Sequence, residues 1–224
     1  MSRRPGWGLA LIAVVVAAVC VRLGLWQLDR LEHRRTRNAG IAARRALPAV
    51  ALEQAAGLGL TADSLAQRRV TAVGVYDWAH ERVWPGRTHD GAPGVALLTP
   101  LRLADGSAVF VDRGWVPSPD AQTVDRAAVR EPDSARVLGL AQHAPRAPGD
   151  VDPVALVDSL PYALRPIVLV VLPDSARPVT AGMPVLRWPA PVLSGGPHLS
   201  YAIQWFAFAV IAVGGAIAVL RRRN

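Results

Sequence analysis

The chain has 224 residues and a formal net charge of +8, and 51% of its residues are hydrophobic. All 25 basic residues are arginine, which excludes mechanisms that need a lysine amine: a Walker A phosphate loop, a pyridoxal Schiff base or a serine–lysine dyad. The single cysteine, Cys20, excludes an internal disulfide, a Cys-x-x-Cys redox centre, a cysteine-rich zinc or iron–sulfur site and a paired-cysteine copper carrier.

The positive charge is concentrated at the two ends of the chain. Residues 1–37 contain seven arginines against Asp29 and Glu32, and three arginines follow Leu220. Residues 38–200 hold fifteen arginines and fifteen acidic residues. Because this central region is neutral, the net charge of +8 does not predict a nucleic-acid partner and instead indicates flanks of membrane segments.

Two uncharged runs predict transmembrane helices. Tyr201 to Leu220 has no charge and, at about 1.5 Å per residue, is long enough for the roughly 30 Å hydrocarbon core. Trp7 to Val21 reaches spanning length if Arg22 lies at the interface and the helix continues through Trp26. A cleaved secretory signal is the alternative for the first run, but no small-x-small cleavage site follows it, and a lipoprotein signal would need a small residue where valine precedes the cysteine.

The flanking arginines give two conflicting orientations. Three arginines follow the second run, whereas few basic residues precede it, which places the C-terminus in the cytoplasm and, with two spans, the N-terminus there as well. The first run alone favours the opposite orientation, because five arginines follow it and two precede it. We follow the second run, whose asymmetry is cleaner, and expect the central region to be extracytoplasmic.

The region between the two runs predicts a compact, strand-rich domain. Residues 28–45 are expected to continue the first helix, and residues 60–69 to form a short second helix. Strands are predicted at residues 70–76, 95–103, 108–116, 137–142, 167–172 and 184–188. Asp105-Gly106 predicts a hairpin, because both residues tolerate the positive φ of tight turns. Pro100 indicates an edge position or a bulge in the first arm.

Two further helices and two loops complete the prediction. Ser118-Pro119 is expected to open a helix to about Val129, and Asp152-Pro153 another to about Leu160. Residues 143–153 and 173–197 are expected to be loops. The predicted fold is an α+β membrane protein: an N-terminal transmembrane helix at 1–27, a barrel- or sandwich-like extracytoplasmic domain at 28–197, and a C-terminal transmembrane helix with a basic tail at 198–224.

The sequence carries few signs of an enzyme. It has no Gly-x-Ser-x-Gly elbow, no His-Glu-x-x-His, no dinucleotide fingerprint and no calcium loop. His80-Glu81 and His89-Asp90 lie beside turn-forming residues, so we interpret them as solvated loop residues. A membrane-anchored hydrolase would require one of these histidines and an acid to converge in one pocket.

Two segments at the membrane edges are candidate binding sites. Helical spacing places four residues of the first segment on one face, namely Leu23, Trp26, Gln27 and Arg30. In the second segment the shared face holds His198, Tyr201, Ala202 and Trp205. A histidine at the start of a span can ligate haem iron while guanidinium groups of a neighbouring helix hold the propionates. The alternative is interfacial anchoring by an aromatic belt.

Four short motifs follow one another along the chain: Gly24-Leu-Trp26-Gln27-Leu-Asp-Arg30, Gly74-Val-Tyr76-Asp77, Thr99-Pro100 with Val111-Asp-Arg113-Gly114-Trp115-Val116-Pro117, and His198-Leu-Ser-Tyr201-Ala202-Ile-Gln204-Trp205-Phe206. In this order they resemble the surfeit-locus-1 family of cytochrome oxidase assembly proteins, and a bacterial member in particular. Each motif is short, but their joint order is specific. The resemblance covers the chain except for about residues 135–195.

The resemblance implies a multi-pass protein of the plasma (inner) membrane with both termini in the cytoplasm, which agrees with the second run. It implies a chaperone-like, non-enzymatic role in respiratory chain biogenesis, the building of haem–copper oxidases. Bacterial members are implicated in handing haem a to the oxidase catalytic subunit, so the expected partners are that subunit and haem a synthase. His198 matches the proposed ligand of the haem iron. The other expected haem-binding residues are Tyr201, Gln204, Trp205, Trp26, Gln27 and Arg30.

Two expectations concern the domain and the competing function. The segment from His143 to Leu160 is shorter than its family counterpart and lacks a tryptophan. We expect four motif residues of the strands to be structural: Gly74, Arg113, Gly114 and Trp115. The arginine would pair with an acid, glycine would relieve crowding between strands, and the tryptophan would fill the core. The alternative function is a haem-independent scaffold that stabilises an oxidase assembly intermediate.

Overall fold

The computed structural model describes residues 7–144, 156, 159–173 and 185–223. It divides into two compact units, one made of Met1–Ala42 with Val192–Asn224 and the other of Ala43–Pro191. The first unit is helical and the second is strand-rich. The helix predicted from Asp152 to Leu160 falls mostly outside the described residues.

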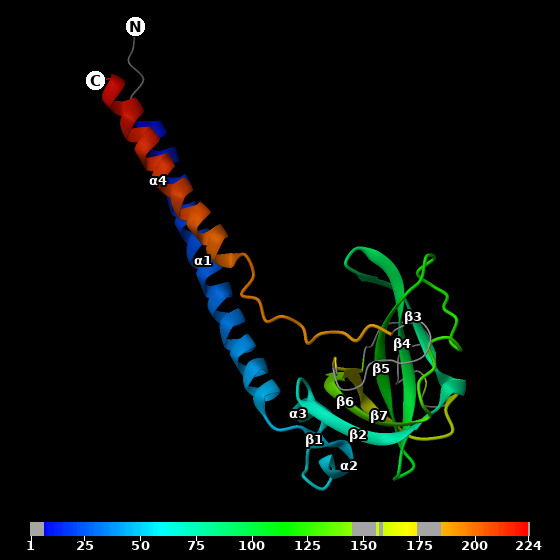
Figure 1. Ribbon diagram of the computed structural model, residues 1–224. Helices are drawn as coiled ribbons and strands as arrows, with labels where there is room; N and C mark the ends of the chain where they lie inside the picture. Colours follow the sequence, from blue (N-terminus) through cyan, green and yellow to red (C-terminus); the bar gives the residue numbers. More distant parts are fainter. Residues whose placement is uncertain (1–6, 145–155, 157–158, 174–184, 224) are drawn as a thin grey trace. The chain divides into compact units, whose positions relative to one another are not determined.

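The helical unit contains two long apolar helices (Figure 1). α1 spans Trp7–Ala46, and α4 spans His198–Arg223. Both are long and apolar enough to cross a membrane, with mean hydropathies of 2.5 and 2.2 in their most apolar windows. α4 lies antiparallel along the N-terminal half of α1, because its first residue contacts Gln27 while its chain runs back toward the start of α1. The helix predicted to continue over residues 28–45 is confirmed.

Small residues line the contact between α1 and α4. On α1 they recur at alternating spacings of four and three, the pattern of a coiled-coil seam, at Ala13, Ala17, Cys20 and Gly24, and on α4 they include Ala202, Ala209, Ala212 and Ala216. A Cβ built on Gly24 would lie 2.6 Å from Cε1 of Phe206, so only glycine leaves room for this ring. Small residues at such a contact let two apolar helices approach each other closely.

The strand-rich unit is a barrel-like sheet of seven strands. In chain order they are β1 (Val50–Ala51), β2 (Arg69–Tyr76), β3 (Arg82–His89), β4 (Ala92–Leu103), β5 (Ala108–Pro117), β6 (Ser134–His143) and β7 (Leu164–Val171). The sheet order is β1-β2-β6-β7-β5-β4-β3, and an additional pairing of β2 with β4 closes the ring. Three short helices accompany it: α2 (Leu52–Ala55), α3 (Ala62–Leu65) and the 3-10 helix η1 (Trp78–His80). The expected strand-rich, barrel-like architecture between two long apolar helices is confirmed.

The predicted hairpin forms the centre of this domain. β4 and β5 pair antiparallel around Asp105-Gly106, and Gly106 has a φ of 82°. Nearly every residue of both strands is buried, because their two faces contribute to different clusters. Leu101 and Val111 belong to one cluster, and Leu98 and Phe110 to another. Burial on both faces explains why these strands read as continuous apolar runs.

Pro100 lies neither on an edge strand nor at a bulge. β4 pairs with β3 up to Leu98 and with β2 from Leu101 onward, so the proline occupies the point at which β4 changes neighbour. Its carbonyl accepts a hydrogen bond from the Asp77 N–H. The proline has no N–H, but this position lies between the β3 and β2 pairings of β4, so no hydrogen bond of either pairing is lost.

The helix predicted at 118–129 is wrong, because an aspartate takes the local N–H groups. Asp120 accepts hydrogen bonds from the N–H groups of Gln122 and Thr123, at 2.9 Å each, and from the Ser118 hydroxyl. These bonds hold the pKa of Asp120 well below its usual range. Ala121 adopts a φ of 54°, which ends any helical path. The segment therefore forms successive turns.

Two other elements differ from expectation. β3 is a strand although the sequence predicts none there, since Pro85 and Gly86 are turn-forming residues; the sheet accommodates them by a register shift between Trp84 and Arg87 on its terminal strand. The helix expected over residues 60–69 is limited to α3. The strand expected over 184–188 is one bridge, between Leu186 and Trp115.

Candidate functional site

The start of α4 contacts α1 through a histidine and a glutamine. Nδ1 of His198 lies 2.8 Å from Oε1 of Gln27, and both side chains are half-buried. These two predicted site residues are 171 positions apart in sequence. The helix pair therefore brings the glutamine of the first motif to the histidine of the fourth.

This contact sets the tautomer of the histidine. A side-chain amide oxygen only accepts hydrogen bonds, so Nδ1 of His198 carries the proton and donates it. In the neutral imidazole, Nε2 then keeps its lone pair, and no described residue hydrogen-bonds to it. An imidazole whose second nitrogen is held by an acceptor is the usual arrangement of a metal-ligating histidine. The residues present thus fit the axial ligation of a haem iron by Nε2.

The other predicted site residues do not meet at His198. The Arg30 guanidinium carbon lies 5.9 Å from the centre of the Trp26 ring, one helical turn away, and both side chains are exposed. Tyr201 and Gln204 are exposed on α4, and Trp205 makes an edge contact with Phe208 at 5.9 Å between ring centres. The exposed aromatic residues among them, Trp26 and Tyr201, match the pattern of an interfacial belt.

One residue near His198 was missed by the sequence analysis. A Cβ built on Gly196 would lie 3.1 Å from Nη1 of Arg34 and 3.6 Å from Nε2 of His198. The guanidinium and the imidazole therefore face the same glycine. The signal was the helical spacing of Arg34, seven residues after Gln27 on the same face of α1. In the described part of the chain, no group of three or more His, Cys, Asp or Glu residues has the arrangement of a metal site.

Arg113 of the Arg-Gly-Trp motif lies in the interior of the barrel-like domain. Arg113 is fully buried, and its guanidinium contacts Glu81 at 2.7 Å and Glu131 at 3.0 Å. Thr99 Oγ1 and the Val129 carbonyl accept its remaining hydrogen bonds. This arginine thus pairs with two acids. Glu81, expected to be a solvated loop residue, is instead 3% exposed.

The glycines of the strand motifs stand where backbones approach closely. Gly114 has a φ of 124°, and a Cβ there would collide with the Leu186 carbonyl. A Cβ on Gly74 would collide with the Arg102 carbonyl, where β2 meets β4. Trp115 is 7% exposed and packs against His89, with 5.4 Å between ring centres. His89 is therefore a half-buried strand residue, contrary to the expectation of a solvated loop.

A hydrogen-bonded cluster joins two segments of the domain. Nδ1 of His80 lies 2.9 Å from Oδ2 of Asp77, and the Tyr162 hydroxyl donates to the same oxygen at 3.0 Å. Partial burial works to raise the pKa of Asp77, but the hydrogen bonds from His80 and Tyr162 outweigh it and hold the pKa below its usual value. Within the described residues, no serine, threonine or cysteine side chain hydrogen-bonds to His80.

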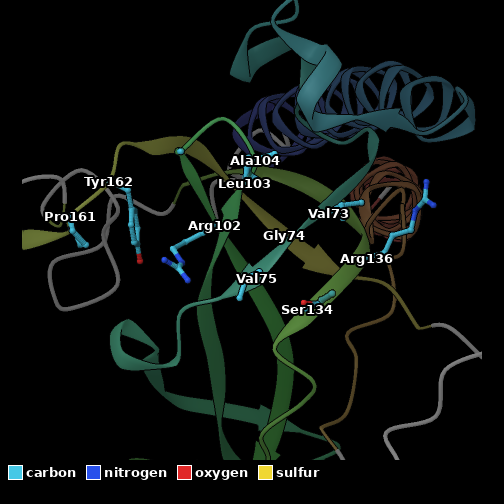
Figure 2. Close-up of a pocket in the computed structure, with 12 residues that line it drawn as sticks. Val73, Gly74, Val75, Arg102, Leu103, Ala104, Ser134, Arg136, Pro161 and Tyr162 are labelled. Atoms are coloured by element: carbon cyan, nitrogen blue, oxygen red, sulfur yellow. The ribbon is translucent and has the colours of Figure 1, made fainter.

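Tyr162 also lines an open hollow of about 870 Å³ on the barrel. Figure 2 shows Arg102 and Tyr162 on one side of Gly74 and Arg136 on the other. The floor is apolar, and Val73 and Val75 of β2 are 51% and 39% exposed there. The hollow lies where Gly74 and Val75 of β2 pair with β4 on one edge of the strand and with β6 on the other.

These features define a class of protein: two apolar helices joined by a histidine site, with a closed strand-rich domain inserted between them in the sequence. A family model described as the SURF1 family matches residues 14–210, and the chain belongs to this family. The resemblance to surfeit-locus-1 proteins is thereby confirmed. Membership implies a role in the assembly of cytochrome oxidase, since the family is one of assembly factors.

Individual relatives agree with this assignment. The chain is 27% identical over 246 residues to a SURF1-like protein of Monosiga brevicollis, an alignment that covers 100% of this chain and 91% of that protein. It is 29% identical over 242 residues to an uncharacterised SURF1-like protein of Mycobacterium bovis, with 99% and 87% covered. A SURF1-like protein of Rickettsia felis is 27% identical over 107 residues, with 47% and 45% covered.

Proposed function

We propose that this protein binds haem a at His198 and delivers it to the catalytic subunit of cytochrome oxidase. The observation that carries the proposal is the Gln27–His198 hydrogen bond, which leaves Nε2 of the imidazole free to ligate iron. Haem a is cargo in this proposal, so binding is transient. Haem a synthase, as the source of the cargo, and the oxidase subunit, as its acceptor, are the proposed partners.

We place both helices in the plasma (inner) membrane. Their apolar side chains are exposed rather than covered by protein: Val14 is 62% exposed on α1 and Val210 is 71% exposed on α4. A lipid environment removes the cost of exposing such side chains to water. The proposed topology has both termini in the cytoplasm and the barrel-like domain outside, as the three arginines at the C-terminal end of α4 favour.

The test is the haem content of the purified full-length protein. We would express it in cells that also make haem a and record the Soret band of the wild type, His198→Ala and His33→Ala. The control, His33, lies exposed on α1 beside Asp29. We expect bound haem in the wild type and in His33→Ala and its loss in His198→Ala.

Two results would contradict the proposal. Equal haem content in the wild type and His198→Ala would show that the imidazole is not the ligand. Oxidase subunits that co-purify with a protein free of chromophore would instead support the haem-independent scaffold.

A further inference from the structure

One face of α1 lies along the chain segment that precedes α4. The Asn38 amide donates to the Ser194 carbonyl at 3.0 Å. A Cβ built on Gly195 would lie 3.4 Å from Cδ1 of Leu31, and one on Gly196 would lie 3.1 Å from Nη1 of Arg34. The guanidinium of Arg34 thus lies beside the segment that leads into His198.

Arg34 lacks the partners that its neighbours have. Asp29 pairs with His33, and Arg30 stacks on Trp26. Over the described residues, no acidic group or hydrogen-bond acceptor contacts the Arg34 guanidinium, although the side chain is half-buried. A partly desolvated guanidinium without a counter-charge favours the binding of an anion, and its planar donors suit a carboxylate.

Gly196 lies next to both the Arg34 guanidinium and the His198 ring. With a φ of 72°, it has a conformation that other residues rarely adopt, and it has no side chain to separate Nη1 of Arg34 from Nε2 of His198. A metal-binding nitrogen and a free cation therefore face one point. Such a pair matches a molecule that carries both a metal and a carboxylate.

We infer that Arg34, rather than Arg30, binds a propionate of the haem that His198 ligates. This inference rests on the proposed function. It adds that Arg34 distinguishes a porphyrin with free carboxylates from one without them. Arg34 would contribute a charge-assisted hydrogen bond, whose loss weakens binding by about tenfold. It would leave the axial ligand, and hence the Soret maximum, unchanged.

The test is a titration of the full-length protein in detergent with two probes, haemin and haemin dimethyl ester, which lacks free carboxylates. We expect Arg34→Gln to bind haemin about tenfold more weakly than the wild type, with the same Soret maximum. We expect the ester to bind the wild type and Arg34→Gln equally. Arg37→Gln is the matched control, an exposed arginine one turn further along α1, and should bind both probes as the wild type does.

Arg34→Lys keeps the charge and should retain most of the affinity for haemin, which separates loss of the cation from a disturbed helix pair. Wild-type affinity of Arg34→Gln for haemin, or an equal loss with the ester, would overturn the inference while the proposed function stands if His198→Ala still loses binding. A wild type that binds neither probe, or His198→Ala that binds both normally, would overturn the proposed function and this inference together.

Discussion

Oε1 of Gln27 accepts a hydrogen bond from Nδ1 of His198, with 2.8 Å between the two atoms. This hydrogen bond orients the imidazole ring and fixes its tautomer. An acceptor behind a metal-ligating histidine makes the ring more basic and restricts its rotation. In the proposed haem site, Gln27 would therefore be a positioning residue that acts on the haem through His198.

Replacement of Gln27 should affect haem in two distinguishable ways. Gln27→Leu removes the acceptor and should weaken haem binding by about 10- to 100-fold. Gln27→Glu provides a stronger acceptor, should retain affinity and should lower the reduction potential of the bound haem. Haem titration and redox potentiometry of the purified variants measure both effects. Asn38→Leu removes a nearby hydrogen bond to Ser194 and serves as the structural control; an equal shift of potential in this variant would refute the positioning role.

The buried ion pair of the barrel predicts a large loss of stability in one variant. Arg113→Met leaves the Glu81 carboxylate, 2% exposed, without its partner and should lower the free energy of unfolding by about 3–5 kcal/mol. Urea unfolding followed by tryptophan fluorescence measures this. The matched control is Arg130→Met, because both guanidiniums lie over the Trp78 ring, at 4.8 and 5.1 Å.

Arg130 pairs with Asp133 at the surface, so its replacement should cost less than about 1 kcal/mol. Adding Glu81→Gln to Arg113→Met should recover part of the loss, because the unpaired buried charge is removed. Equal losses in the two arginine variants would show that burial of the Arg113–Glu81 pair does not matter to folding.

A buried carboxylate predicts a dependence of stability on pH. Burial raises the pKa of Asp112 from 3.8 to about 6, and the Gly114 N–H and the charge of Arg87 offset this only in part. The folded state therefore holds a proton that the unfolded state releases between these two values. Stability from this group is present at low pH and is lost as pH rises from about 4 to about 6.

Asp112→Asn should remove this dependence and keep the oxygen that accepts the Gly114 N–H. At pH 7 the variant should be more stable than the wild type, by up to roughly 3 kcal/mol, and near pH 4 the two should be equal. Thermal unfolding of both proteins across this range gives the difference. Parallel pH profiles of the two proteins would contradict the assignment.

The proposed topology can be tested by labelling single cysteines. Cys20→Ser removes the native thiol, and Asp90→Cys then places one on the barrel, where the aspartate side chain is 93% exposed. A membrane-impermeant maleimide should label this cysteine in intact cells. A cysteine at Asn224, in the same background, should react only after the membrane is opened. Labelling of the two sites in the reverse order would establish the opposite orientation.

Local pattern was sufficient to predict several elements of this protein. The uncharged runs predict α1 and α4, because helix length and side-chain polarity are properties of a continuous segment. The hairpin of β4 and β5 follows from Asp105-Gly106 between two apolar runs, since the turn depends on its own two residues. Gln27 and His198 belong to two of the sequence motifs, but the motifs do not predict the contact between them.

Where local signals oppose tertiary packing, the sequence was misleading. Pro85 and Gly86 are typical of a turn, yet the residues on both sides of them pair with β4 and form strand β3. Ser118-Pro119 resembles a helix start, yet the Asp120 carboxylate takes the N–H groups that would begin it. In the first case pairing with a neighbouring strand outweighs the turn preference of the segment, and in the second case side-chain hydrogen bonds outweigh its helix preference.

By itself, the sequence determined two apolar helices, a neutral strand-rich region between them and the family to which their motifs belong. The tertiary structure decided which side chains meet: Gln27 with His198, Arg113 with Glu81, and Arg34 with the space left by Gly196. The physical reason is the distance along the chain over which each interaction acts. Polarity and turn preference act within a few residues, whereas an ion pair or a binding site depends on how distant segments pack, which no single segment specifies.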